Sequence, residues 1–188
     1  MDTHFVHVAD RAQEVIDVAA ALDFVSDPGF GGITVFVGRI RDLNYGRKIT
    51  GISYDMYRPL ALARFAEIAA QATRDVGPAL KLYIAHAVGR LEVGDVAVVV
   101  AAGTPHRDEA FRACRAAIES VKHATPIWKQ EHFEDGDSTW SEGCSLCDAP
   151  VASTASIGEP ATDAPAIEAA GHEHGHGHGR GDCGGAHA

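Results

Sequence analysis

The chain has 188 residues, 46% of them hydrophobic, which is enough for one domain with a substantial core. Its formal net charge of −10 argues against a general nucleic-acid-binding protein, because such proteins present a basic surface. The N-terminus lacks the basic start and apolar run of a signal peptide, and no stretch approaches the roughly 20 apolar residues of a membrane span. We therefore expect a cytoplasmic protein without nucleic-acid or membrane partners.

The first half of the chain predicts alternating strands and helices. Residues 5–8 read as a short edge strand, and residues 11–24 repeat apolar side chains at helical spacing. Two segments rich in β-branched residues, 32–40 and 49–57, are predicted to pair as strands around a long polar loop. Alanine-rich residues 59–76 then predict a second helix, which the following Gly-Pro pair ends.

The second half continues this alternation. The apolar runs 80–88 and 96–102 predict two strands separated by a turn-prone segment. Thr104 is a favourable N-cap with Pro105 at the first helical position, so a helix to about residue 123 is expected. Its buried face would consist of Phe111, Cys114, Ile118 and Val121.

A final strand over residues 127–133 would place Lys129 and Glu131 on the same face. The interleaved strands and helices indicate the α/β or α+β class. We expect one domain over residues 1–140, followed by a disordered tail over 141–188, where large apolar residues are almost absent. Only one of the four cysteines lies in the domain, so no disulfide framework can hold it together.

Three basic residues suggest an anion site. His106 and Arg107 lie at a predicted helix start, where free N–H groups and the positive end of the helix dipole favour phosphate. Arg41 follows a predicted strand at the mouth of a loop, where a guanidinium can bind phosphate through two hydrogen bonds. The alternative for all three is ordinary solvated surface charge.

Lys122 and Lys129 are a candidate catalytic pair. They lie seven residues apart across Pro126, so a helix end and a strand start could present both amines to one pocket. Two ammonium groups held close together favour the neutral, nucleophilic form of one of them, which suits acyl or sulfur transfer. Spacing alone favours the alternative, two solvated lysines that interact with the helix dipole.

Four motifs resemble the large subunit of molybdopterin synthase, the MoaE family. They are GGITVFVGRIRD, AHAVGRLEVGD, TPHRDEAFRA and KHATPIWKQE, the last followed by Trp140. The chain departs from the family pattern at Ala87, where many members have arginine, and at Asp55, where glutamate is common. The similarity covers roughly residues 5–140.

The resemblance implies a hammerhead-like α/β fold with mixed or antiparallel sheets, a homodimer, and a heterotetramer with a small ubiquitin-like sulfur carrier. The carrier's C-terminal Gly-Gly thiocarboxylate would supply sulfur to a cyclic pterin phosphate (cyclic pyranopterin monophosphate), forming the dithiolene of molybdopterin. By position, Arg41, His106 and Arg107 would bind this substrate, some of them across the dimer interface. Lys122 and Lys129 would be catalytic. No metal or organic cofactor would be required.

The tail offers a competing hypothesis, because cysteine and histidine favour zinc, nickel or copper. A metal-delivery protein acting through the tail, or a non-catalytic assembly subunit, would be the alternative to an enzyme. A single Cys-x-x-Cys with a distant histidine run is weak evidence for one defined site, which favours incidental affinity for Zn or Ni over a selected metal-handling role. The candidate ligands are Cys144, Cys147, His172, His174, His176, His178 and Cys183.

Overall fold

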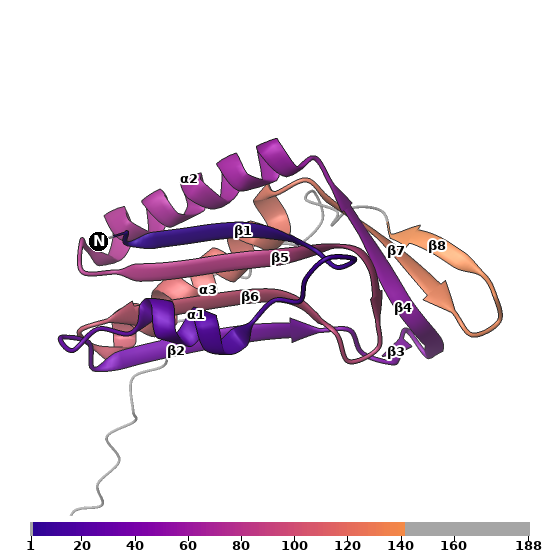
Figure 1. Cartoon of the computed structure of the whole chain (residues 1–188), viewed down its shortest axis with the longest axis horizontal. Coiled ribbons are helices and arrows are strands. Elements are labelled where there is room, and N and C mark those ends of the chain that lie inside the picture. The colour runs from indigo at the N-terminus through magenta and orange to yellow at the C-terminus, as the bar shows by residue number, and fades with distance from the viewer. Residues whose placement is uncertain (1, 142–188) are drawn as a thin grey trace, which may run out of the picture. The chain divides into compact units, whose positions relative to one another are not determined.

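The computed structural model describes residues 2–141, which form a mixed α and β body (Figure 1). The strands are β1 (His4–Asp10), β2 (Gly32–Arg39), β3 (Leu43–Asn44), β4 (Arg47–Met56), β5 (Lys81–Glu92), β6 (Val96–Thr104), β7 (Ile127–Phe133) and β8 (Ser138–Ser141). The helices are α1 (Val18–Val25), α2 (Arg58–Val76) and α3 (Arg107–Ala124). The tail and its candidate metal ligands lie outside the described residues.

The strands form one continuous sheet in the order β2-β6-β5-β4-β7-β8. β1 adds to β5 in parallel, β3 adds to β4, and all pairs except β1–β5 are antiparallel. This mixed sheet agrees with the α+β class predicted from the sequence.

β5 connects the two parts of the sheet. Its first part pairs with β1 and β6, and its last residues, Gly89–Glu92, pair with β4. Gly89 has φ +97°, a conformation that glycine adopts easily, so the strand changes direction there and continues. The prediction that a turn begins at Gly89 was therefore wrong, and β5 runs on to Glu92.

Two hydrophobic cores lie on opposite faces of the strands. α2 and α3 cover one face, and α1 covers the other (Figure 1). Along β5, Leu82 and Ile84 belong to the first core, whereas Tyr83 and Ala85 belong to the second. This follows from the alternation of side chains along a strand, and it explains why β5 reads as a continuous apolar run.

The predicted pairing of the second and third strand segments was wrong. β2 pairs with β6 over its whole length, from Gly32 opposite Thr104 to Arg39 opposite Val96, and β4 lies between β5 and β7. The polar loop between β2 and β4 closes on β4 alone through the two-residue strand β3. Neighbours in sequence are therefore separated in the sheet.

α1 begins seven residues later than predicted. The backbone N–H of Arg11 donates to Val88 O at 3.0 Å, and its guanidinium binds Asp95 at 3.0 Å. These contacts hold the chain in a turn, and the helix begins only where the Asp17 side chain accepts from Ala19 N.

α3 also differs from the prediction at its start and on its buried face. Its N-cap is His106, whereas the Thr104 hydroxyl donates to His106 O at 2.7 Å. Phe111 is 59% exposed, so its predicted burial was wrong. Cys114, Ile118 and Val121 are buried as predicted, with small residues completing the face at Ala110, Ala113 and Ala117.

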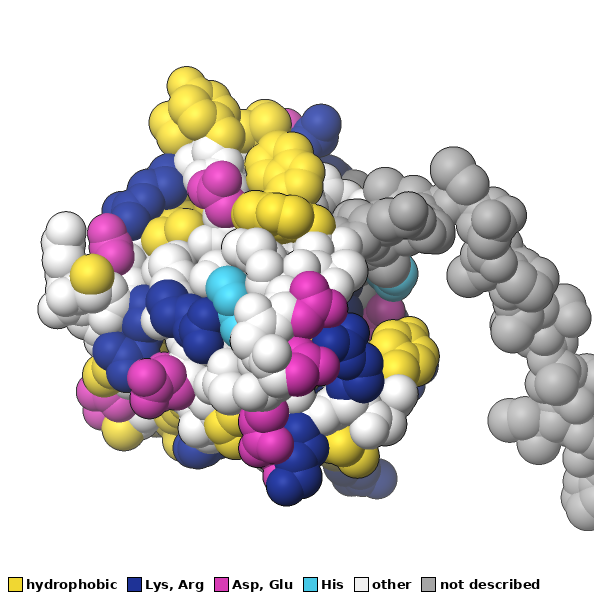
Figure 2. Space-filling view, turned by 90° about the vertical axis from the view of Figure 1, so that its right-hand side faces the viewer, with side chains coloured by type: hydrophobic (Ala, Val, Ile, Leu, Met, Phe, Trp, Pro, Cys, Tyr) yellow, Lys and Arg dark blue, Asp and Glu magenta, His cyan; other side chains and the backbone are white. Residues whose placement is uncertain are grey.

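Figure 2 shows the end of the body that carries β4, β7 and β8, where Lys and Arg side chains alternate with Asp and Glu. No single basic patch covers this face. None of the helices within residues 2–141 combines the length and hydropathy needed to cross a bilayer.

Candidate functional site

Lys129 and Glu131 form the centre of the candidate site on β7. Lys129 Nζ lies 2.8 Å from Glu131 Oε1, which confirms that alternation places both side chains on the same face. Glu131 is only 7% exposed. A buried carboxylate is costly without partners, so Glu131 must be stabilised by its neighbours.

Asn44 connects this pair to Arg41. The Arg41 guanidinium donates through Nη2 to Asn44 Oδ1 at 2.8 Å. Asn44 Nδ2 donates to Glu131 Oε1 and Oε2 at 2.7 and 2.8 Å. A continuous series of polar contacts therefore runs from Arg41 through Asn44 and Glu131 to Lys129.

These residues line two neighbouring hollows. One of about 350 Å³ and one of about 160 Å³ share Asn44, Lys129 and Glu131. Arg41 lines the smaller hollow together with Tyr54. Cationic side chains on a hollow surface suit an anionic ligand.

The electrostatics keep Glu131 ionised. Burial by itself would raise the pKa of Glu131, but hydrogen bonds from Lys129 and Asn44 and the charges of Lys129 and Arg41 outweigh it, so the pKa lies below its usual range. Burial, with a smaller contribution from the Glu131 charge, raises the pKa of Tyr54 to about 12. The site therefore presents a permanent carboxylate beside a neutral phenol at pH 7.

Lys122 lies in the last turn of α3, with its ammonium 5.8 Å from the centre of the Phe36 ring on β2. Lys129 forms an ion pair with the Glu131 carboxylate. That Lys122 and Lys129 present their amines to one pocket stays a prediction.

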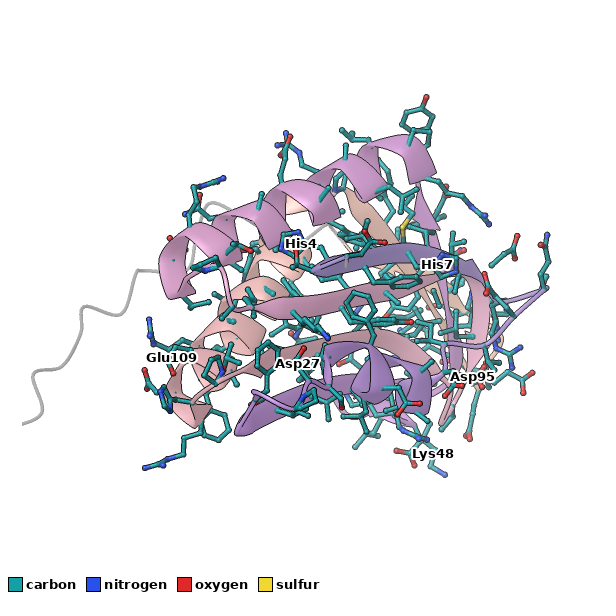
Figure 3. All side chains as sticks on the ribbon, turned by 60° about the vertical axis from the view of Figure 1, so that its left-hand side comes forward. His4, His7, Asp27, Lys48, Asp95 and Glu109 are labelled. Carbon is teal, nitrogen blue, oxygen red and sulfur yellow. The ribbon has the colours of Figure 1, made fainter. Side chains whose placement is uncertain are left out.

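His106 and Arg107 lie at the other end of α3. Gly32 makes this placement possible, because a Cβ there would lie 2.7 Å from Arg107 Cα. From residue 107 to Lys122 the helix rises about 22 Å at 1.5 Å per residue. Figure 3 shows Glu109, in the first turn of α3, at the end of the body opposite Lys48 of β4. A single chain therefore does not bring His106 and Arg107 to Lys122.

His86 is a buried histidine on β5. It is 6% exposed, its Nδ1 lies 2.8 Å from Ala87 O, and its ring packs edge-on against Tyr54 at 4.9 Å. Burial lowers the pKa of His86 to about 4, so the ring is neutral at pH 7.

Two site residues were missed as candidates when only the sequence was considered. Glu131 was noted for sharing a face with Lys129, and that alternation was the available signal. Asn44 gave no signal, because its partner Glu131 is 87 positions away in the chain. Within residues 2–141, His, Cys, Asp and Glu side chains form no group that could hold a metal ion.

Comparisons with known proteins identify the family of the chain. The family model described as "MoaE protein" matches residues 11–124. The molybdopterin synthase catalytic subunit of Synechococcus elongatus is 43% identical over 141 residues, which is 75% of this chain and 86% of that protein.

Solved structures show the same fold. Molybdopterin synthase from Staphylococcus aureus superposes with a TM-score of 0.66 at 32% identity, covering 75% of this chain and 98% of the other. A complex of subunits 1 and 2 of the molybdopterin-converting factor from Helicobacter pylori matches with a TM-score of 0.59 at 24% identity, covering 77% and 93%. The sequence identity and the family match together show that the chain belongs to the MoaE family.

Proposed function

We propose that the chain is the catalytic subunit of a cytoplasmic molybdopterin synthase. It transfers sulfur from the C-terminal thiocarboxylate of a small carrier subunit to a cyclic pterin monophosphate, forming the molybdopterin dithiolene. Family membership supports this activity. The structural observation that carries it is the arrangement of Arg41 and Lys129 around one hollow, joined by Asn44 and Glu131.

Each basic residue has a role suited to its place. Arg41 binds the phosphate of the pterin at the edge of the hollow, because a guanidinium is always charged and offers paired donors. Lys129 orients the pterin or supplies a proton to it from the floor of the same hollow. Lys122, at the end of α3, meets the thiocarboxylate of the carrier and assists release of sulfur.

A homodimer completes the site. His106 and Arg107 lie about 22 Å along α3 from Lys122. The proposed substrate is smaller than this separation, so these two residues act on substrate bound mainly to the second copy of the chain. Two carrier subunits on such a dimer give a heterotetramer.

The body over residues 1–140 is the catalytic domain in this proposal, and residues 141–188 are dispensable for turnover. The His and Cys residues of the tail supply affinity for Zn or Ni that catalysis does not use. Ending the chain after Ser141 should therefore preserve sulfur transfer and remove metal binding measured by calorimetry. Loss of sulfur transfer in the truncated chain would instead favour a function of the tail.

The test of the activity is reconstitution. The purified chain is mixed with a thiocarboxylated carrier and the cyclic pterin monophosphate, and the dithiolene product is measured as its fluorescent oxidised pterin. Lys122→Ala and Lys129→Ala should lose product, whereas Lys48→Ala, an exposed lysine on β4, should form it normally. No product from the native chain, despite a complex with the carrier, would contradict the proposal.

A further inference from the structure

Asn44 connects the Arg41 guanidinium to the ion pair that Glu131 forms with Lys129. It accepts from Arg41 at 2.8 Å and donates to both oxygens of Glu131, which in turn contacts Lys129 at 2.8 Å. The orientation of its amide is fixed by chemistry, because a guanidinium can only donate and a carboxylate can only accept. Neither aspartate nor a hydroxyl residue could make the same three bonds.

The backbone around Asn44 is held in place by a tight hairpin. Tyr45 and Gly46 have φ +47° and +80°, as in the two-residue turns with positive φ at both central positions, and Asn44 pairs with Arg47. Arg47 is anchored in turn by Asp135 and by the Phe133 ring, whose centre lies 3.5 Å from the guanidinium carbon. The amide is therefore presented from a fixed position.

Arg41 depends on this support. It follows β2 in the loop and is exposed, so without a partner its guanidinium would sample many rotamers and would lose that freedom when it bound an anion. A hydrogen bond to Asn44 removes part of that cost before the ligand arrives. At the other end, the Asn44 amide neutralises none of the Glu131 charge, so the carboxylate still attracts Lys129.

We propose that Asn44 is a positioning residue that holds Arg41 and Lys129 in a fixed mutual arrangement through Glu131, so that an anionic group bound by Arg41 lies next to the Lys129 ammonium. This inference rests on the proposed function for the identity of the substrate. It does not require turnover, because binding of inorganic phosphate is measured without sulfur transfer, and the Arg41→Ala background isolates the part of that binding that depends on Arg41.

The experiment is a double-mutant cycle in which phosphate binding is measured by calorimetry or by NMR. Asn44→Ala should weaken binding of inorganic phosphate about tenfold, the effect of losing one hydrogen bond to a charged group. In an Arg41→Ala background, the same substitution should change the remaining affinity less than about twofold, because Asn44 acts through Arg41. Equal effects of Asn44→Ala in the two backgrounds, or no phosphate binding by the native chain, would overturn the proposal.

Two further variants separate hydrogen bonding from packing. Asn44→Asp keeps the size of the side chain but places a second carboxylate next to Glu131. It should therefore lower turnover at least as much as Asn44→Ala does. A native Kd for phosphate and a native kcat in this variant would overturn the proposal. Gln130→Ala is the matched control, because it removes an amide that bonds Ser138 on the opposite face of β7. It should retain native phosphate binding and turnover.

The proposed function and this inference can fail separately. If the native chain binds phosphate but forms no dithiolene with a competent carrier, the synthase assignment fails while the phosphate cycle still decides the role of Asn44. If the native chain forms product, the cycle is repeated with KM for the cyclic pterin phosphate. Asn44→Ala should then raise KM about tenfold in the native background, with the same non-additivity toward Arg41.

Discussion

Replacing Gly32 by alanine should disturb the start of α3 in a measurable way. The new Cβ would lie 2.7 Å from Arg107 Cα, 2.8 Å from Arg107 N and 2.9 Å from His106 C. All three are backbone atoms, which cannot rotate aside, so the helix start must move by about 0.7 Å to restore an ordinary contact of 3.4 Å. Such overpacking costs about 1–3 kcal/mol and should lower Tm by roughly 3–10 °C.

The assay is thermal unfolding followed by circular dichroism, with Gly29→Ala as the control. A Cβ at Gly29 would lie 3.4 Å from its nearest neighbour, Asp27 Oδ1, so a methyl group fits there. Because Gly32 sets the place of His106 and Arg107, its variant should also raise KM for the pterin while leaving carrier binding unchanged. If the Tm values of the two variants lie within about 1 °C of each other, the predicted clash at Gly32 is refuted.

Three more outcomes are expected. Lys122→Ala and Lys129→Ala should each slow dithiolene formation by about 10²-fold or more, while gel filtration still shows carrier binding. Native rates in both variants would contradict the catalytic roles of these lysines. Burial lowers the pKa of His86 to about 4, below the unfolded value near 6.5. As the pH falls, the imidazole is therefore protonated in the unfolded chain before it is protonated in the folded chain. The free energy of unfolding should fall by roughly 3 kcal/mol between pH 6.5 and pH 4. His86→Gln should flatten that part of the Tm–pH curve, and an unchanged slope would count against this account. Burial raises the pKa of the Cys114 thiol to about 11. In a chain ending at residue 141, Cys114 should therefore resist iodoacetamide at pH 8 until guanidinium is added to unfold the protein. Rapid alkylation of the folded chain, detected by mass spectrometry, would contradict this prediction.

Local patterns predicted most elements correctly because their causes are local. α2 begins at Arg58 with Pro59 in its first turn and ends before Gly77, as composition and punctuation indicate. β7 matches its predicted range, and the alternation within it correctly placed Lys129 and Glu131 together. These features depend on residues within a few positions of each other.

Pairing and the site network depend on distant contacts that no local pattern encodes. β2 and β4 follow each other in the sequence, yet β2 pairs with β6, some 60 positions along the chain. The Asn44–Glu131 hydrogen bonds likewise appear only once the small hairpin folds onto β7. The helix α1 was predicted too long because the ion pair between Arg11 and Asp95, which are also far apart in the sequence, holds the first residues of the predicted helix in a turn.

The length of α3 has a consequence for mixed populations of inactive chains. In the proposed dimer, Arg107 and Lys122 of one chain serve different reaction centres. Chains carrying Arg107→Ala and chains carrying Lys122→Ala, produced together, would then assemble into about half mixed dimers. Each mixed dimer has one reaction centre with both substitutions and one with neither, so about a quarter of all centres would be intact. The two inactive variants would then complement each other.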